Sequence, residues 1–184
     1  IPDATDWRKI TEGGKDKWVV RIPIKQGLTW TDGVEFNATD VAFTYNTIIT
    51  LPDATAYGDF NFLLDRVVAV DRYTVDFVYK PGMGPDYDFA GYNAHGWGLA
   101  MLPWHQLKND DLTNWKTALW NKDVIPVSSG GHGLECLGPY VPVDWKPPYS
   151  WVRFKLRPQF VSTMGWANTL PEYWYMSYIP DDTT

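Results

Sequence analysis

A metal site is the first chemistry that the residue types of this sequence allow us to test. His132 and Cys136 stand four residues apart, a spacing that would place two ligands on one face of a helix. Gly133 and the glycines around it disfavour a helix there, and no second pair of ligands lies close in the sequence. Structural zinc sites usually combine two paired clusters of ligands. We therefore expect no metal ion at these residues.

Catalytic residues are also hard to find among the polar side chains. Ser128 and Ser129 precede His132, but no G-x-S-x-G motif surrounds either serine, so a polar loop is the simpler interpretation. Asp86 and Asp88 lack the glycine and the final glutamate of a calcium-binding loop. No glycine-rich phosphate-binding motif is present, and no pair of carboxylates is marked by an unusual setting. The sequence therefore predicts no catalytic residue and no cofactor.

Aromatic side chains are the remaining source of chemistry, and they are abundant, with 11 Trp, 11 Tyr and 8 Phe. Most of them belong in a core by default, and such a surplus also raises the chance of a surface that stacks on sugar rings or peptide side chains. Trp97 lies between two glycines, where it is either a stacking platform or a plug between domains. Trp104 follows Pro103 at a helix start, where a core position is the commoner role. Trp166 and Trp174 are expected to cover surface that another part of a longer chain would otherwise bury.

Composition and charge set the class of protein. The chain has 184 residues, of which 45% are apolar and 21% charged, as is typical of globular proteins. Its net charge of −6 disfavours a nucleic-acid partner, which is usually met by a basic face. No apolar run approaches the ~18 residues that a membrane helix requires. The chain opens with IPDATDW, without an initiator Met or a signal sequence, so we expect a mature secreted product or a piece of a longer protein.

The elements that position these residues begin with a strand over 18–25, where apolar and other residues alternate. Because Pro23 has no N–H, this strand should lie at an edge of its sheet or carry a bulge. A tight turn follows at Asp32-Gly33, since glycine accepts the backbone angles of a sharp bend.

A helix is predicted over 38–50, where apolar residues recur at helical spacing. Asn37 is a good N-cap, and Asp40 stands at the third helical position, where its carboxylate can reach back to the cap. The polar face of this helix would carry three residues, Thr39, Thr44 and Asn46.

The rest of the chain is expected to alternate short elements with loops. A hairpin is predicted over 65–80, with its turn at Asp71-Arg72. The other expected elements are a glycine-rich loop over 81–98, a short helix after Pro103, a helix over 111–121, a glycine-rich loop over 126–139, strands over about 140–145 and 151–157, and an irregular aromatic tail over 158–184. This order indicates one domain, or a fragment of a protein, over 1–184, with an α+β fold of a mostly antiparallel or mixed sheet and a few packed helices.

Four stretches of the sequence together carry a resemblance to a known family. The first, over 18–48, reads WVVRIPIKQGLTWTDGVEFNATDVAFTYNTI and is followed by VVAVDRYTVDFVY, MLPWHQL and LGPYVPVDW. In content and order they resemble the family 5 extracellular solute-binding proteins, the receptors of ABC importers for peptides, nickel and oligosaccharides. The residues of the first stretch that match are Lys25, Gly27, Trp30, Asp32, Gly33, Ala38, Asp40, Val41, Phe43 and Tyr45. The likeness covers about residues 18 to 157.

The resemblance implies part of a periplasmic-binding-protein type II-like fold, in which two lobes close on a ligand. Family members are much longer, so we expect an N-terminal-region fragment that lacks the second lobe. The Arg-Asn-Pro-x-Tyr-Trp segment usual in the family is reduced here to Arg157 and Pro158. We interpret Asp32 and Asp40 as structural residues, because the turn and the helix cap would fix how strand and helix join.

The function implied by the resemblance is that of the substrate-binding component of an ABC importer, located in the periplasm or on the cell surface. Its expected partners are an oligopeptide or oligosaccharide, the membrane subunits of the importer and the missing second lobe. The candidate ligand contacts are Trp97, His95 and Trp104, and the aromatic content favours a carbohydrate. Two alternatives stay open. One is a self-associating structural module of the cell surface, and the other is an accessory domain of a glycosidase, which the lack of catalytic residues disfavours.

Overall fold

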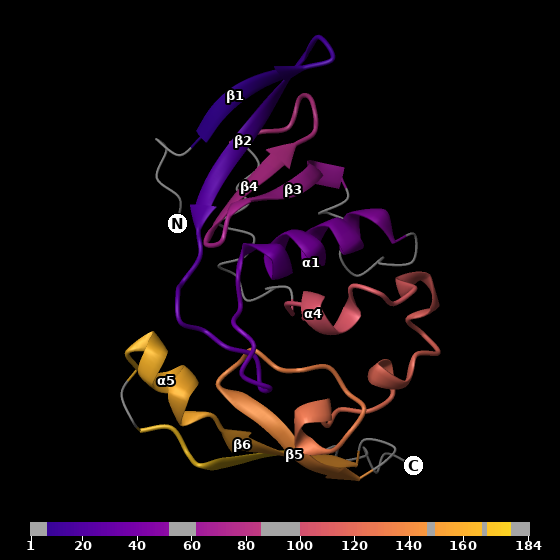
Figure 1. The fold of residues 1–184 in the computed structure, drawn as a ribbon, viewed down its shortest axis with the longest axis vertical. Helices are drawn as coiled ribbons and strands as arrows, with labels where there is room; N and C mark the ends of the chain where they lie inside the picture. Colours follow the sequence, from indigo (N-terminus) through magenta and orange to yellow (C-terminus); the bar gives the residue numbers. More distant parts are fainter. Residues whose placement is uncertain (1–6, 52–61, 86–99, 147–149, 167–168, 178–184) are drawn as a thin grey trace, which may run out of the picture. The chain divides into compact units, whose positions relative to one another are not determined.

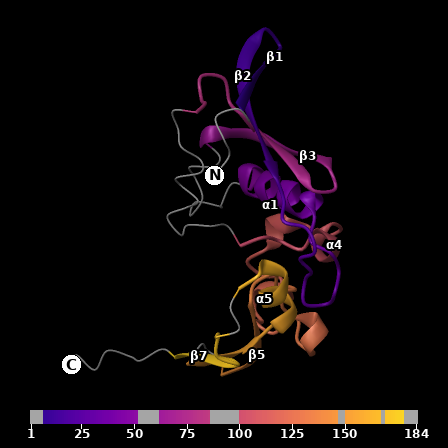
Figure 2. The same ribbon diagram turned by 90° about the vertical axis from the view of Figure 1, so that its left-hand side faces the viewer.

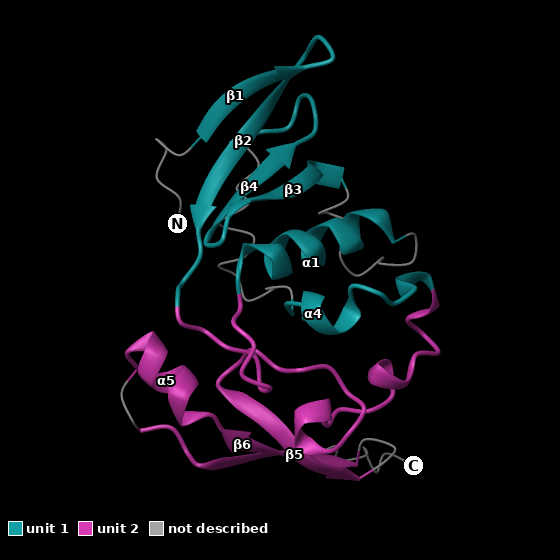
Figure 3. Cartoon of the chain, viewed as in Figure 1, with its two compact units in different colours: residues 1–26, 37–113 teal, residues 27–36, 114–184 magenta. Residues whose placement is uncertain are grey.

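The structure, a computed structural model, describes residues 7–51, 62–85, 100–146, 150–166 and 169–177. These residues form two antiparallel sheets with packed helices, so the predicted α+β fold is confirmed (Figure 1). They group into two compact units: unit 1 holds residues 1–26 and 37–113, and unit 2 holds residues 27–36 and 114–184 (Figure 3). The sequence analysis treated the chain as one domain or fragment and did not foresee that segment 27–36 would join the second unit.

Unit 1 is built on a four-stranded antiparallel sheet with the strand order β1-β2-β4-β3. Its strands are β1 (Trp7–Glu12), β2 (Lys15–Pro23), β3 (Leu64–Asp71) and β4 (Thr74–Tyr79). The predicted hairpin over 65–80 is confirmed as the pair β3 and β4. At its turn, the N–H of Tyr73 donates to Asp71 Oδ1 at 2.8 Å. The sequence analysis missed β1, because the stretch WRKITE alternates only weakly between apolar and polar residues.

The position of Pro23 corrects one prediction. The strand β2 is not at an edge, because β1 and β4 pair with its two sides, and its pairing with β4 has no bulge. The pairing with β1 ends at Val20, which faces Trp7, so Pro23 lies beyond that pairing at the last residue of β2. A proline is tolerated there because the ladder toward β1 requires no N–H at this position.

Helix α1 (Ala38–Thr50) lies against the sheet beside β3 and β4, as two perpendicular views show (Figures 1 and 2). The predicted capping box is confirmed. Asn37 Oδ1 accepts the N–H of Thr39 at 2.8 Å, and Asp40 Oδ2 accepts the N–H of Asn37 at 3.0 Å. Tyr45 meets Phe77 edge to face, with ring centroids 4.9 Å apart. No helix among the described residues is long and apolar enough to cross a membrane.

A side-chain amide joins α1 to the edge strand of this sheet. Asn46 Nδ2 donates to Val67 O at 2.8 Å, and Asn46 Oδ1 accepts the N–H of Val67 at 2.9 Å. The strand β3 is the last strand on its side of the described sheet, so the outward groups of Val67 face no further strand. Asn46 satisfies both of them, so a residue predicted on the polar face of the helix covers part of the sheet edge.

Unit 2 contains a three-stranded antiparallel sheet with the order β5-β6-β7. Its main elements are β5 (Tyr140–Lys146), β6 (Trp151–Leu156), helix α5 (Pro158–Met164) and β7 (Tyr173–Ser177). The strands β5 and β6 confirm the two predicted strands. The tail that was expected to be irregular contains α5 and β7 in its described part. Helix α5 starts with a proline and stops at Gly165, whose φ of 68° suits glycine at a helix end.

The helix predicted over 111–121 is wrong. The segment forms two 3₁₀ turns instead, η3 (Leu112–Asn114) and η4 (Leu119–Asn121). Asp111 Oδ1 accepts both the N–H and the hydroxyl of Thr113, at 3.0 and 2.6 Å. Such local bonds compete with a helical backbone. No residue of either turn is buried. The apolar side chains of these turns are therefore not packed in a core that would stabilise a helix.

The core of unit 2 depends on segment 27–36. Trp30 is only 1% exposed and meets Phe36 edge to face, with ring centroids 5.9 Å apart. Arg157, which follows β6, ties this segment to the rest of the unit. Its guanidinium donates at 2.7 to 3.1 Å to four backbone carbonyl oxygens, those of Thr29, Trp30, Cys136 and Gly138.

Candidate ligand-binding site

The structure describes one of the three side chains that were predicted to contact a ligand. Trp104 is the first residue of the short helix α4 (Trp104–Leu107), and a helix start after Pro103 was predicted correctly. The side chain of Trp104 is 38% exposed, so it is not the core residue that its position suggested. His95 and Trp97 lie outside the described residues.

Trp104 lines a trough that runs along the outer side of α1 and has a volume of about 380 Å³. The helix supplies most of the lining from positions three or four residues apart, and β3 supplies one wall residue. The lining includes Thr39, Phe43, Thr47, Thr50, Ala69 and Trp104. All of them belong to unit 1, so the trough forms within one compact unit. We call this feature the α1 trough.

The α1 trough combines apolar surface with hydroxyl groups. Phe43 and Trp104 bring aromatic rings, and Thr39 and Thr47 bring hydroxyls. Lys108 Nζ lies 4.8 Å from the centroid of the Trp104 ring, a distance typical of a cation–π contact. Ligands with flat apolar faces and hydrogen-bonding groups suit such a surface. Among the residues that the structure describes, the lining includes no histidine, cysteine or carboxylate, so these lining residues offer no general acid or base.

Two side chains of α1 hold the backbone that carries Trp104. Asp40 Oδ1 accepts the N–H of Trp104 at 3.0 Å, and Thr44 Oγ1 accepts the N–H of Leu102 at 2.9 Å. The prediction that Thr44 belongs to the polar face of the helix is wrong, because this residue is fully buried. Its hydroxyl also donates to the carbonyl oxygen of Asp40 at 2.7 Å, which leaves the buried group satisfied.

The serine, histidine and cysteine residues considered for chemistry lie in unit 2 and make contacts within it, whereas Asp86 and Asp88 lie outside the described residues. Ser128 Oγ donates to Glu135 Oε2 at 2.6 Å, and His132 Nδ1 lies 3.4 Å from Asp123 Oδ2. Burial raises the pKa of the Cys136 thiol to about 11, which leaves it protonated and a poor nucleophile at neutral pH. Among the residues that the structure describes, no group of three or more His, Cys, Asp or Glu side chains could hold a metal ion.

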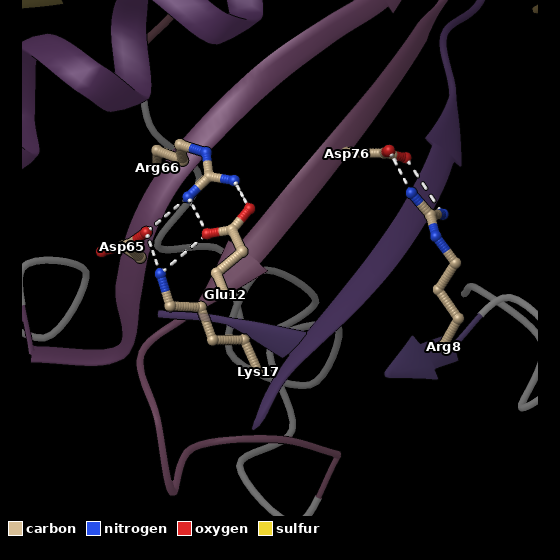
Figure 4. A network of polar contacts seen from close by, with 6 residues as sticks. All are labelled: Arg8, Glu12, Lys17, Asp65, Arg66 and Asp76. Atoms are coloured by element: carbon tan, nitrogen blue, oxygen red, sulfur yellow. Dashed lines mark hydrogen bonds and ion pairs between the residues drawn. The ribbon is translucent and has the colours of Figure 1, made fainter. Parts of the chain in front are cut away.

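Charged side chains form two groups on the sheet of unit 1 (Figure 4). In the first group, Arg66 donates to both carboxylate oxygens of Glu12, at 2.5 and 2.9 Å. Lys17 Nζ lies 3.0 Å from Glu12 and 3.0 Å from Asp65. The hydrogen bonds from Arg66, followed by those from Lys17, lower the pKa of Glu12 from 4.5 to about 2. The carboxylate of Glu12 is therefore engaged within the sheet.

The second group is centred on Asp76 of β4. Arg21 donates to its two oxygens through Nε and Nη2 at 2.8 and 2.9 Å, and Arg8 pairs with the same carboxylate. Burial raises the pKa of Asp76, but the hydrogen bonds from Arg21 and Arg8 outweigh burial and hold the pKa below its ordinary value of 3.8. Because the charges of both groups satisfy one another, we interpret this surface as a structural feature of the sheet.

The sequence analysis named Trp104 as a candidate ligand contact but none of the α1 residues beside it, although it placed Thr39 and Asn46 on the polar face of the helix. Phe43 was noted only as part of a motif, and Thr47 was not considered. The available signal was the predicted helix itself, because residues 39, 43, 47 and 50 share one face at helical spacing. The element that lies beside this face of α1 is set by the hydrogen bonds of Asp40 and Thr44 to the segment 102–104. No local sequence pattern predicts those hydrogen bonds.

Comparison with known proteins identifies the family. The model of bacterial extracellular solute-binding proteins, family 5 Middle, matches residues 4–184. The chain therefore belongs to this family, and the resemblance carried by the four stretches is confirmed. Family 5 proteins bind solutes, so the prediction that the chain is not an enzyme is also confirmed. No curated protein matches the sequence.

Solved structures share the fold at low sequence identity. The periplasmic oligopeptide-binding protein of an oligopeptide ABC transporter from Thermotoga maritima gives a TM-score of 0.64 at 20% identity, over 95% of this chain and 28% of that chain. The same protein with bound mannohexaose gives 0.62 at 20% identity, over 94% and 28%. The oligopeptide-binding protein AppA from Bacillus subtilis, in complex with a nonapeptide, gives 0.59 at 21% identity, over 84% and 27%. The chain thus has part of this fold and spans less than a third of these proteins.

Proposed function

We propose that this chain is part of the substrate-binding component of an ABC importer and binds oligopeptides or oligosaccharides. The observation that carries the proposal is the match of the family 5 model to residues 4–184. The fold supports it, because the similar structures from Thermotoga maritima and Bacillus subtilis are oligopeptide-binding proteins. The physical action would be enclosure of a ligand by apolar and aromatic walls with a few polar anchors.

The chain would act as one fragment, residues 1–184, of a longer protein. Its length supports this, because it covers 28% of the Thermotoga maritima protein. Its partners would be the second lobe, which closes over the ligand, and the membrane subunits of the importer. The family is extracellular, so the chain works outside the cytoplasm, and we propose the periplasm or the cell surface as its location. The net charge of −6 supports the absence of a nucleic-acid partner.

The ligand contacts would include Trp104, with His95 and Trp97 as further candidates. The support for Trp104 is its half-exposed ring at the α1 trough, next to Phe43 and to threonine hydroxyls. An exposed tryptophan on a surface lined by apolar and hydroxyl groups is suited to stacking with hydrogen bonds at the rim.

We favour an oligosaccharide as the ligand. The Thermotoga maritima protein is named for oligopeptides, yet one of its structures holds mannohexaose, whereas the Bacillus subtilis protein holds a nonapeptide. One architecture therefore accommodates both classes of ligand. The 11 tryptophans of this chain and the threonine hydroxyls of the α1 trough favour a sugar ligand, because sugar rings stack on aromatic rings and bond to hydroxyl groups.

Calorimetric titration of the longer protein that contains this chain, with mannohexaose and with a nonapeptide, tests the proposal, because the second lobe would take part in enclosing the ligand. Binding of mannohexaose is expected, and Trp104→Ala should weaken it by about fivefold or more, since truncated aromatic contacts often cost ~1 kcal/mol or above. The matched control is Trp174→Ala, which removes a tryptophan that is 49% exposed in unit 2 and should leave binding unchanged. Binding of the nonapeptide alone would reject the sugar preference, and binding of neither would contradict the proposal.

A second candidate is a self-associating module of the cell surface. The observation that favours it is β7, where all five residues are exposed and Tyr173, Trp174 and Tyr175 are 42, 49 and 61% exposed. An uncovered aromatic edge strand is prone to pair with another chain. Light scattering with size-exclusion chromatography would measure the mass. A concentration-dependent dimer that Tyr175→Lys abolishes would support this function, and a strict monomer would argue against it.

A further inference from the structure

Two buried polar side chains of α1 are bonded to the segment that leads into α4. Asp40 is 3% exposed and Thr44 is 0% exposed, and they stand one helical turn apart. Together they accept the N–H groups of Trp104 and Leu102, at 3.0 and 2.9 Å. Buried polar groups that bond to a segment far along the chain restrict that segment strongly, because breaking either bond leaves a group unsatisfied.

The residue between these two donors is a proline. Pro103 is fully buried, has no N–H to be satisfied and holds φ at −72°. The segment 102–104 therefore points both of its N–H groups at α1 and has little backbone freedom between them. The ring of Trp104 leaves this fixed backbone and reaches the α1 trough, where Lys108 stacks on it.

Helix capping alone does not explain these contacts. The bond from the N–H of Asn37 to Asp40 Oδ2 completes the capping box, and it leaves Oδ1 for Trp104. Thr44 lies in the helix interior, where no capping role exists and a threonine is a mediocre helix former. The contact between Thr44 and Leu102 is therefore a tertiary one.

We propose that Asp40 and Thr44 are positioning residues that hold the Trp104 ring at the α1 trough before any ligand arrives. A ring fixed in advance loses less conformational freedom on binding, which improves affinity. The benefit for binding rests on the proposed function, since it treats Trp104 as a ligand contact. The positioning itself is a property of the free chain and is measurable without a ligand.

Nuclear magnetic resonance of the isotope-labelled 184-residue chain tests the proposal. The first readout is the amide exchange of Leu102 and Trp104. The second is the ring-current shift that the Trp104 indole imposes on the side-chain methylene protons of Lys108. Thr44→Val removes the hydroxyl at nearly constant volume. It should speed the exchange of Leu102 by about tenfold, the effect of one hydrogen bond worth ~1.4 kcal/mol, and reduce the Lys108 shift.

Three further variants separate positioning from general stability. Thr44→Ser keeps the hydroxyl and should restore both readouts. Asp40→Asn should speed the exchange of Trp104 and reduce the Lys108 shift. Asn37→Ala weakens the cap of α1 by removing the acceptor of the Thr39 N–H and keeps the bonds of Asp40 and Thr44 to segment 102–104, so it should leave both readouts as in the wild type. An unchanged Lys108 shift in Thr44→Val and Asp40→Asn, or an equal loss in Asn37→Ala, would overturn the proposal. Failure of the longer protein that contains this chain to bind mannohexaose or a nonapeptide would contradict the proposed function instead and leave these readouts intact.

Discussion

Unit 1 and unit 2 have different kinds of core. Unit 1 closes an apolar layer between its four-stranded sheet and α1, with Tyr45 packed on Phe77 at its centre. In unit 2 the buried apolar side chains among the described residues are few. Three of them, Leu28, Trp30 and Phe36, come from the inserted segment 27–36, and the others are Pro126, Pro142, Val152, Leu156 and Val161. A short segment between two elements of unit 1 thus supplies the large aromatic part of the core of unit 2.

The polar contacts of the two units differ in the same way. In unit 1, Asp76 pairs with Arg21 of the neighbouring strand, and Glu12 of β1 pairs with Arg66 of β3, so both pairs link strands of one sheet that backbone hydrogen bonds already hold together. In unit 2, Arg157 bonds to backbone carbonyl groups of loops. Glu135, 6% exposed, accepts hydrogen bonds from Thr31 Oγ1 at 2.5 Å and from Ser128 at 2.6 and 2.8 Å. We therefore expect unit 2 to depend more strongly on single side chains.

The largest effect is expected from Trp30→Ala. Truncation of a fully buried large aromatic residue typically lowers the free energy of unfolding by ~3–5 kcal/mol. Because Trp30 and Phe36 pack together within unit 2, amide exchange should accelerate in β5 and β6 and much less in β2 and β4. Hydrogen exchange resolved by residue measures this difference.

A matched control for that variant is Trp104→Ala, which truncates a half-exposed tryptophan of unit 1. Its effect on stability should be small, since surface substitutions usually change the free energy of unfolding by ~0.5 kcal/mol or less. Equal loss of protection in both units after Trp30→Ala would contradict the contrast between them, because the units would then open as one.

Arg157→Ala should have the second largest effect. It removes four hydrogen bonds to carbonyl oxygens, and we expect a loss of ~2–3 kcal/mol, in the range of bonds made by charged donors. Burial, which removes water from around the cation, holds the pKa of Arg157 below its usual value. Thermal unfolding measures the loss, and exchange in β5 and β6 locates it.

Arg157→Lys separates geometry from charge in this interaction. A lysine keeps the charge but has a single nitrogen, which cannot reach the carbonyl groups of Thr29 and Gly138 in the way the planar guanidinium does. It should recover less than half of the lost stability. Full recovery by lysine would show that charge alone stabilises the unit and would weaken the account of unit 2.

Helix α1 could be predicted to the residue because its determinants are local. Asn37 and Asp40 form the capping box within four residues, and Val41, Tyr45 and Ile48 show the spacing of a buried helical face. The hairpin β3 and β4 was predictable for the same reason, since its turn and alternation lie within one short stretch.

Contacts between residues that are far apart in the chain could not be predicted from the sequence patterns. Thr31 bonds to Glu135 across 104 positions, and Arg157 to Thr29 across 128. The Asp32-Gly33 turn was interpreted as the joint between strand and helix, but it belongs to unit 2. The candidate site shows the same limit. Aromatic content suggested Trp104, whereas its neighbours in the α1 trough follow from tertiary packing, and its contact with a ligand stays a prediction.

Asp76→Asn should have a smaller effect, confined to unit 1, of about 1–2 kcal/mol at neutral pH. The folded pKa of Asp76 lies below its ordinary value of 3.8, so its stabilisation is complete above that pH and is lost as the pH falls through the folded pKa. The difference in stability between the wild type and Asp76→Asn should therefore shrink below pH 3.8. Denaturant unfolding at several pH values measures it, and a difference that grows in acid would contradict the ion-pair interpretation.

The smallest effect, and the sharpest test of the charged sheet in unit 1, concerns the titration of Glu12. Its carboxyl pKa should be near 2, against an ordinary value of 4.5, because Arg66 bonds to both of its oxygens and Lys17 to one. Carbon-detected titration should therefore show Arg66→Met raising the pKa of Glu12 more than Lys17→Met does. The reverse order would mean that Lys17, the less exposed of the two cations, governs the carboxylate. The charged cluster of Glu12, Lys17, Asp65 and Arg66 would then depend on the Lys17 ammonium rather than on the bidentate geometry of the guanidinium.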